Sequence, residues 1–154
     1  MKNKTRAGFT LIELLVVIAI IGILSTLTMA AFNNSRKSGR DAVRAENIAT
    51  ITNALAMFLN DSPVGYPAST GECLNSGSGV GAELKTSVVL PNIPLDPLWP
   101  AITPVDADTD GVPDNDQTNF CYYYFSNDTK QYKISYFLEL KSNAGNAGIN
   151  TLVR

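Results

Sequence analysis

The sequence predicts an α+β protein in which a long N-terminal α-helix packs on a small antiparallel β-sheet. Three features of its 154 residues indicate this fold. All eight prolines lie between Pro63 and Pro113, so no proline interrupts a helix in the first 62 positions. Residues 9–32 contain 18 hydrophobic residues out of 24, as expected for an apolar helix. Eight aromatic residues fall between Phe120 and Phe137, and aromatic residues are enriched in strands.

The helix begins with an apolar segment long enough to cross a membrane. Residues 1–8 are cationic, and after Glu13 the stretch from Leu14 to Ser35 carries no charge. These 22 residues would rise about 33 Å as a helix, which spans the hydrocarbon of a bilayer. A secretory signal peptide is the alternative, but its apolar run would be shorter and would end in a small-residue cleavage site. Glu13 either lies at the membrane interface or meets a positive charge from another chain.

The second half of the helix, residues 36–60, is amphipathic. Its apolar side chains fall within one half of the helical circumference and are expected to pack on the rest of the chain. They are Val43, Ile48, Ile51, Leu55, Phe58 and Leu59. The basic residues between Arg36 and Arg44 are expected at lipid headgroups or against acidic neighbours. The Asp61-Ser62-Pro63 segment ends the helix, because proline disfavours helical geometry at the residue before it.

The remaining residues, 61–154, are expected to form a small head domain. Alternating apolar and polar residues predict a strand over 132–141, and residues 120–126 predict a second strand. The turn residues 127–129 between them predict an antiparallel hairpin. Residues 68–82 are rich in serine and glycine and predict a loop, and residues 142–154 predict either a loose tail or an edge strand.

The segment Gly8-Phe9-Thr10-Leu11-Ile12-Glu13, followed by an apolar helix, resembles the class III signal of type IV prepilins and type II secretion pseudopilins. This resemblance implies a type IV pilin-like fold with four parts. They are a leader peptide at 1–8, a transmembrane and filament-core helix at 9–35, an amphipathic half-helix at 36–60 and a globular pilin head at 61–154. It also implies that a prepilin peptidase cleaves between Gly8 and Phe9 and methylates the Phe9 amine. Glu13 would then neutralise that amine in a neighbouring subunit during assembly.

A second, weaker resemblance lies in the head domain. The segment Pro94-Leu95-Asp96-Pro97-Leu98-Trp99 is similar to the Asp-Pro-Trp segment of major pseudopilins, except that Leu98 separates Asp-Pro from Trp.

An acidic segment between residues 106 and 117 has the spacing of a calcium-binding loop. Aspartates occupy positions 1, 3, 5 and 9, and glycine occupies position 6. Position 12 is Gln117 rather than glutamate, and no helices flank the segment, so an EF-hand is rejected. The predicted oxygen ligands are Asp106, Asp108, Asp110, the Val112 carbonyl, Asp114 and Asp116. The alternative is a solvated acidic turn. No cofactor is required, and calcium is the candidate ligand.

The two cysteines, Cys73 and Cys121, are expected to form a disulfide, since cysteines outside the cytoplasm commonly pair. Such a bridge would close a loop of about 49 residues and stabilise the fold by roughly 4 kcal/mol on the chain-entropy model. Two unrelated buried thiols are the alternative.

The chain is not expected to be an enzyme. It contains no histidine, which excludes Ser–His–Asp and Cys–His catalysis and histidine-based metal centres. The residues after Ala45 include five basic and twelve acidic residues, so no nucleic-acid partner is expected either.

The resemblance implies a structural subunit that polymerises with itself into a type IV pilus or a pseudopilus. Its other partners would be the prepilin peptidase, an assembly machinery in the inner membrane, and membrane lipid before assembly. Its expected place is the bacterial inner membrane, as a single-pass protein with the head outside the cytoplasm, and then an extracellular pilus or a periplasmic pseudopilus. The alternative function is a membrane-anchored calcium-binding or adhesive surface domain that does not polymerise.

Overall fold

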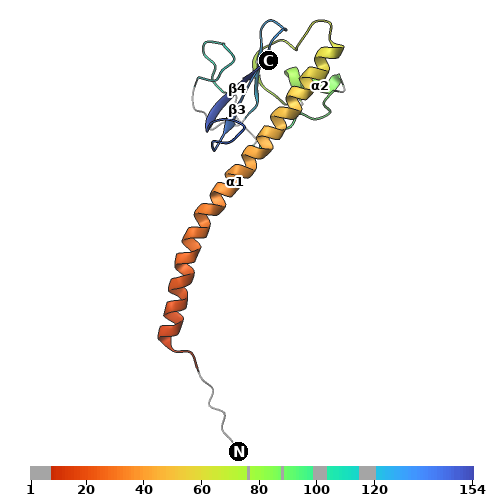
Figure 1. Cartoon of the computed structure of the whole chain (residues 1–154). Helices are drawn as coiled ribbons and strands as arrows, with labels where there is room; N and C mark the ends of the chain where they lie inside the picture. Colours follow the sequence, from red (N-terminus) through yellow and green to blue (C-terminus); the bar gives the residue numbers. More distant parts are fainter. Residues whose placement is uncertain (1–7, 76, 88, 99–103, 115–120) are drawn as a thin grey trace, which may run out of the picture. The chain divides into compact units, whose positions relative to one another are not determined.

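The computed structural model describes residues 8–75, 77–87, 89–98, 104–114 and 121–154. Its elements in chain order are α1 (Leu11–Asp61), β1 (Ser69–Cys73), α2 (Gly79–Thr86), β2 (Tyr123–Ser126), β3 (Lys133–Leu138) and β4 (Gly148–Val153) (Figure 1). The chain divides into two compact units whose boundary lies between Arg36 and Lys37. Helix α1 contributes residues to both units.

In the first unit, α1 presents its apolar side chains outward. Every side chain from Phe9 to Leu24 is exposed, Phe9 to 88%. Within the described part of the chain, α1 is the one helix long and apolar enough to cross a membrane, judged by length and composition. A helix that is apolar all round needs apolar surroundings, which this unit does not supply itself.

The second unit contains a four-stranded antiparallel sheet in the order β1-β2-β3-β4. The predicted hairpin is confirmed, with Tyr124 of β2 opposite Ile134 of β3. The C-terminal segment forms the edge strand β4, which pairs with all of β3. Strand β3 ends at Leu138, earlier than predicted, because the backbone N–H groups of the next two residues donate to the Asp41 carboxylate instead of continuing the sheet.

The prediction of a loop over residues 68–82 was wrong, since β1 and α2 lie there. Strand β1 pairs with β2, and its register shifts between Ser69 and Glu72. Gly71, at φ 114°, allows this irregularity, and a side chain there would collide with the Tyr123 ring. The Glu72 carboxylate accepts the Val80 N–H at 3.0 Å in the first turn of α2. Strand β1 and helix α2 are therefore stabilised by contacts that form only when the chain folds back on itself.

The hydrophobic core joins the second half of α1 to one face of the sheet. Ile51 and Leu55 of α1 are fully buried, as are Tyr124 and Ile134 of the sheet. The buried cluster consists of Ile48, Ile51, Leu55, Phe58, Leu74, Val80, Leu84, Ile93, Tyr122, Tyr124, Tyr132 and Ile134. Most of the predicted apolar stripe of α1 therefore packs as expected. Val43 and Leu59 of the stripe are not in the buried cluster, since they are 43% and 39% exposed.

The predicted disulfide is present. Cys73, the last residue of β1, is bonded to Cys121, two residues before β2, with a Cα–Cα distance of 5.6 Å. Beside it, the Leu74 N–H donates to the Tyr122 carbonyl at 2.9 Å and extends the pairing of the two strands. The bridge thus closes the base of the segment that runs from residue 74 to residue 120.

Candidate functional site

Glu13 is held at the start of α1 by a reciprocal cap with Thr10. The Thr10 N–H and the Thr10 hydroxyl both donate to Glu13 Oε2, at 2.8 and 2.7 Å. The Glu13 N–H donates to Thr10 Oγ1 at 3.3 Å. This is a capping box, in which two otherwise unpaired N–H groups of a helix start are satisfied. The Thr-x-x-Glu spacing is a signal in the sequence that the prediction for Glu13 did not use.

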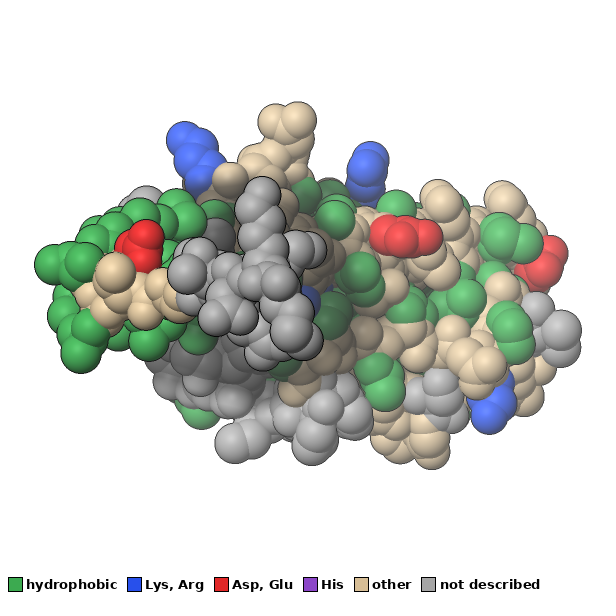
Figure 2. Space-filling model, turned by 90° about the horizontal axis from the view of Figure 1, so that it is seen from below, with side chains coloured by type: hydrophobic (Ala, Val, Ile, Leu, Met, Phe, Trp, Pro, Cys, Tyr) green, Lys and Arg blue, Asp and Glu red, His purple; other side chains and the backbone are tan. Residues whose placement is uncertain are grey.

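The surroundings of Glu13 are apolar. Phe9, Ile12, Val16 and Val17 line a shallow surface hollow together with the Glu13 carboxylate. Figure 2 shows a dense group of hydrophobic side chains on the face seen there, in keeping with the exposed residues of this helix. A carboxylate in such surroundings is costly unless it is hydrogen-bonded or paired with a cation. Thr10 supplies the hydrogen bonds, and a cation would have to come from elsewhere.

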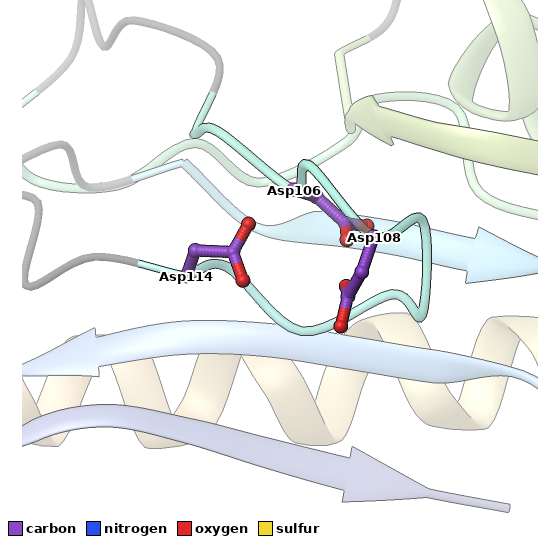
Figure 3. A group of neighbouring side chains, drawn as sticks. All are labelled: Asp106, Asp108 and Asp114. Atoms are coloured by element: carbon purple, nitrogen blue, oxygen red, sulfur yellow. The ribbon is translucent and has the colours of Figure 1, made fainter.

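The acidic segment brings three carboxylates together. Asp106, Asp108 and Asp114 have ligand oxygens within 4.8 Å of one another (Figure 3). Asp106 is half-buried, and Asp108 and Asp114 are exposed. Grouped oxygens of this kind are the donor type that hard divalent cations prefer.

A further predicted ligand, Asp110, does not belong to this group of three. Asp110 Oδ1 accepts the Val112 N–H at 2.7 Å, and Asp110 Oδ2 lies 3.8 Å from Lys133 Nζ. Asp116 lies outside the described residues. Of the four predicted aspartate ligands within the described residues, three are therefore grouped.

Carboxylate oxygens of the acidic segment also accept its backbone N–H groups. Asp106 accepts the N–H groups of Asp110 at 3.1 Å and of Gly111 at 3.0 Å. Asp114 accepts the Ala107 N–H at 2.5 Å, and the Asp114 N–H donates to the Val105 carbonyl at 2.9 Å. These bonds fold residues 105–114 into a compact loop, which we call the acidic loop.

The acidic loop lies on the face of the sheet that α1 leaves uncovered. Ser135 Oγ donates to the Gly111 carbonyl at 3.3 Å, and the Tyr123 hydroxyl donates to Asp106 Oδ2 at 3.1 Å. Gly111, at φ 85°, packs directly against the Phe125 ring. Burial, and after it the Asp106 carboxylate, raises the pKa of Tyr123 to about 12, so this hydroxyl stays a donor at neutral pH. The loop explains why Ser135, on the polar face of β3, is nonetheless buried.

A buried ion network joins α1 to the head. The Arg44 guanidinium, with no exposed surface, donates to Asp96 Oδ2 at 2.6 Å, to Asp41 at 2.7 Å and to Glu139 at 3.0 Å. Arg40 holds Glu139 through two hydrogen bonds, at 2.6 and 2.7 Å. Asp41 in turn accepts the N–H groups of residues 139 and 140. Two cations and three carboxylates therefore share one site.

The pairing controls the ionisation of this network. Burial opposes the charge of Arg44, but its hydrogen bonds to Asp96 and Asp41 outweigh that and raise its pKa. The hydrogen bond from Arg40 lowers the pKa of Glu139. The expectation that Arg40 and Arg44 face lipid or neighbouring chains was wrong. Their partners are acidic residues of the same chain: Asp41 on the same helix, and Asp96 and Glu139, which lie about 50 to 100 positions away.

The start of the chain matches a known family model. Residues 3–29 match the model described as the prokaryotic N-terminal methylation motif. The chain carries this methylation motif. The motif covers the basic start, Gly8, Phe9, the Thr10–Glu13 cap and most of the apolar half of α1.

Two curated proteins are similar to this chain over part of their length. The chain is 32% identical over 62 residues to a type II secretion system core protein G of Aeromonas hydrophila, which covers 40% of this chain and 43% of that protein. It is 31% identical over 68 residues to a type II secretion system core protein G of Vibrio cholerae serotype O1, covering 44% and 46%. The chain thus matches less than half the length of these relatives. No solved structure matches it.

The methylation motif and these relatives confirm the predicted resemblance to the type IV prepilin and type II secretion pseudopilin family. The long helix on a four-stranded antiparallel sheet likewise confirms the predicted pilin-like α+β fold. An apolar α1 that carries a methylation motif fits anchoring in a membrane.

Proposed function

We propose that this chain is a prepilin-type subunit that is processed at its N-terminus and polymerised into a filament. The observation that carries the proposal is the coincidence of a methylation motif with an apolar helix whose side chains are exposed and which carries Glu13. The protein has a structural role in this proposal rather than a catalytic one.

Processing comes first. A prepilin peptidase cleaves between Gly8 and Phe9, and this cleavage removes the three cationic side chains of the leader. The peptidase then methylates the new Phe9 amine. Residues 9–35 then anchor the subunit in the inner membrane, with residues 36–60 packed on the head and residues 61–154 forming the head outside the cytoplasm. The partners at this stage are the peptidase, membrane lipid and the assembly machinery.

Assembly then exchanges lipid for neighbouring helices around the apolar half of α1. In the single subunit the hydrogen bonds of Thr10 satisfy Glu13, but they leave its negative charge uncompensated. The Phe9 amine of a neighbouring subunit supplies the opposite charge. Two opposite charges in an apolar helix bundle are costly apart and tolerable together. This pairing sets the position of one subunit against the next.

The similarity to two type II secretion core proteins G supports a pseudopilus rather than a pilus as the filament. The subunit would then act at the periplasmic side of the inner membrane. Imaging of filaments in a strain that lacks the gene, together with an assay of protein secretion, separates the two outcomes.

Three variants test the proposal. N-terminal sequencing of the mature protein should begin at methylated Phe9, and Gly8→Ala should block cleavage. Glu13→Ala should leave the cleaved protein in the membrane but abolish its incorporation into filaments. Glu46→Ala, an exposed glutamate of the same helix, is the matched control and should assemble normally. Filaments that contain the Glu13→Ala protein at normal levels would contradict the proposal.

The group of three carboxylates favours a second function, calcium binding by the acidic loop. Asp106, Asp108 and Asp114 fit a calcium ion by donor type and by their spacing of at most 4.8 Å. Asp110, the Val112 carbonyl and Asp116 are the further candidates for the six to eight oxygens that calcium takes. Bound calcium would supply positive charge among the carboxylates and stabilise the loop on the sheet. A membrane-anchored calcium-binding or adhesive domain that never polymerises is the alternative to the filament subunit.

Thermal unfolding of the full mature chain in detergent tests the calcium site. Millimolar calcium should raise the melting temperature relative to EDTA, and Asp108→Asn should reduce that shift. Equal melting temperatures with calcium and with EDTA would remove the calcium proposal without affecting the filament proposal.

A further inference from the structure

Lys133 is placed to offset the charge of the acidic loop. Four aspartates, Asp106, Asp108, Asp110 and Asp114, lie within nine positions of the described loop. Among the described residues, Lys133 is the basic side chain that lies within ion-pair distance of any of them. The described loop and Lys133 together therefore carry three uncompensated negative charges, where the loop alone would carry four.

The position of Lys133 follows from the sheet. It is the first residue of β3, and its side chain is on the same face as Ser135, the face on which the loop lies. Its ammonium group donates to the Asp110 backbone carbonyl and lies 3.8 Å from Asp110 Oδ2. It also lies 5.9 Å from the centre of the Phe125 ring, against which Gly111 packs. Lys133 thus contacts both the backbone and the charge of the loop.

Lys133 contacts the loop at Asp110, which lies between two residues with positive φ. Thr109, at φ 55°, and Gly111, at φ 85°, flank Asp110. The N–H groups of residues 110, 111 and 112 all donate to aspartate oxygens, so the turn keeps its shape only while these carboxylates stay close together. Like charges this close repel, and an ammonium ion beside Asp110 opposes that repulsion.

We propose that Lys133 is the resident counter-cation of the acidic loop, which keeps the loop folded on the β2–β3 face in the absence of a divalent metal ion. Lys133 then does for the loop part of what a bound metal would do. A corollary rests on the calcium site proposed above: loss of the ammonium group makes the order of the loop depend on calcium.

Hydrogen exchange of the full mature chain in detergent, in EDTA, tests the proposal. The reporters are the loop N–H groups of Ala107, Asp110, Gly111 and Val112, each of which donates to an aspartate oxygen. Lys133→Met keeps the length of the side chain and removes its charge. It should speed exchange of the reporters about five- to tenfold, the size expected for a charged hydrogen bond that is partly exposed. Lys133→Arg keeps the charge and should restore most of the protection.

Lys130→Met is the matched control, because Lys130 is an exposed lysine in the turn before β3. It should leave the reporters unchanged. The β3–β4 pairing provides internal reference amides that show whether a variant is folded. Unchanged reporter exchange in folded Lys133→Met, or reporters already unprotected in the unmodified chain in EDTA, would overturn the proposal.

Two further arms complete the test. If Lys133→Met does not fold, Lys133→Gln, which also removes the charge, takes its place and should speed the same four amides. Unchanged exchange of those amides in Lys133→Gln would then overturn the proposal. Calcium added to folded Lys133→Met should restore protection. If calcium has no effect on either chain, the calcium site is wrong, whereas the role of Lys133 is still decided by the EDTA comparison.

Discussion

The guanidinium of Arg44 donates two hydrogen bonds, of 2.6 Å and 3.2 Å, to the carboxylate of Asp96, which lies 52 positions later in the chain. Both side chains are buried. Arg44 lies on α1, and Asp96 lies in the segment between α2 and the acidic loop. Asp96 also accepts the Leu98 N–H at 2.8 Å, so the same carboxylate shapes its own turn. The ion pair therefore fixes where this segment meets the helix.

Removing Asp96 should strongly destabilise the second unit. Asp96→Ala removes two hydrogen bonds to the buried guanidinium of Arg44, while its bonds to Asp41 and Glu139 remain, and the loss of hydrogen bonds to a buried charged group costs about 1.5–3 kcal/mol. We expect that loss in urea unfolding of the mature chain in detergent, followed by tyrosine circular dichroism. Glu83→Ala, at an exposed position of α2, should change stability by less than about 0.5 kcal/mol. A loss as small as that control for Asp96→Ala would refute the importance of the pair.

Acid should weaken the fold through Glu139. The pKa of Glu139 is lowered from 4.5 by its hydrogen bond from Arg40, so the folded state releases this proton more readily than the unfolded state. The stability that the pair contributes is therefore complete above about pH 4.5 and is lost as pH falls through the lower, folded-state pKa. We expect this fall in melting temperatures measured across acid pH.

The partner of Glu139 should set the size of that acid loss. Arg40→Gln removes the main cause of the lowered pKa, so the folded-state and unfolded-state pKa values lie closer together and the melting temperature should fall less between neutral and acid pH. Lys85→Gln, at an exposed position of α2, serves as the control and should leave the curve in place. Coinciding acid profiles for Arg40→Gln and the unmodified chain would contradict this account.

The parts of the fold that could be predicted are those encoded by local patterns. The alternation around Ile134 and the turn residues before it predict a hairpin without knowledge of any other segment. The absence of proline and the apolar periodicity through Ile51 and Leu55 likewise predict α1. By contrast, β1 has no such pattern, because its irregular pairing with β2 depends on Gly71 and on a strand about 50 positions away.

The ion network shows the same limit for charged residues. Arg44 lies three positions after Asp41 and four after Arg40, which places its side chain near both on a helix. That spacing does not reveal that Asp96 and Glu139 complete the site, so the arginines were expected at lipid headgroups or against acidic neighbours in the filament. In the acidic loop, spacing alone predicts six equivalent ligands. It could not show that Asp110 lies against Lys133, because strand pairing brings Lys133 there.

Gly111, the glycine of the acidic loop, should not tolerate a side chain. Its φ is 85°, and a Cβ atom there would lie 2.5 Å from Phe125 Cγ, so alanine would strain the backbone and displace the loop. Gly111→Ala should cost about 1–3 kcal/mol in thermal unfolding. Gly39→Ala provides a control of opposite sign, since Gly39 lies inside α1 with open space around it and alanine favours a helix by about 1 kcal/mol. A Gly111→Ala chain as stable as the unmodified one would show that the loop does not need this close contact.

The cap at Glu13 should depend on the hydroxyl of Thr10. Thr10→Val has nearly the same shape but can neither donate to Glu13 Oε2 nor accept the Glu13 N–H from its side chain. Loss of such a cap costs about 1 kcal/mol, so hydrogen exchange of the Glu13 N–H in detergent should be about fivefold faster. Thr10→Ser retains the hydroxyl and should keep the protection of the unmodified chain. Equal exchange in the valine and serine variants would mean that the hydroxyl does not hold the carboxylate, and Glu13 would then rely on a partner outside its own helix.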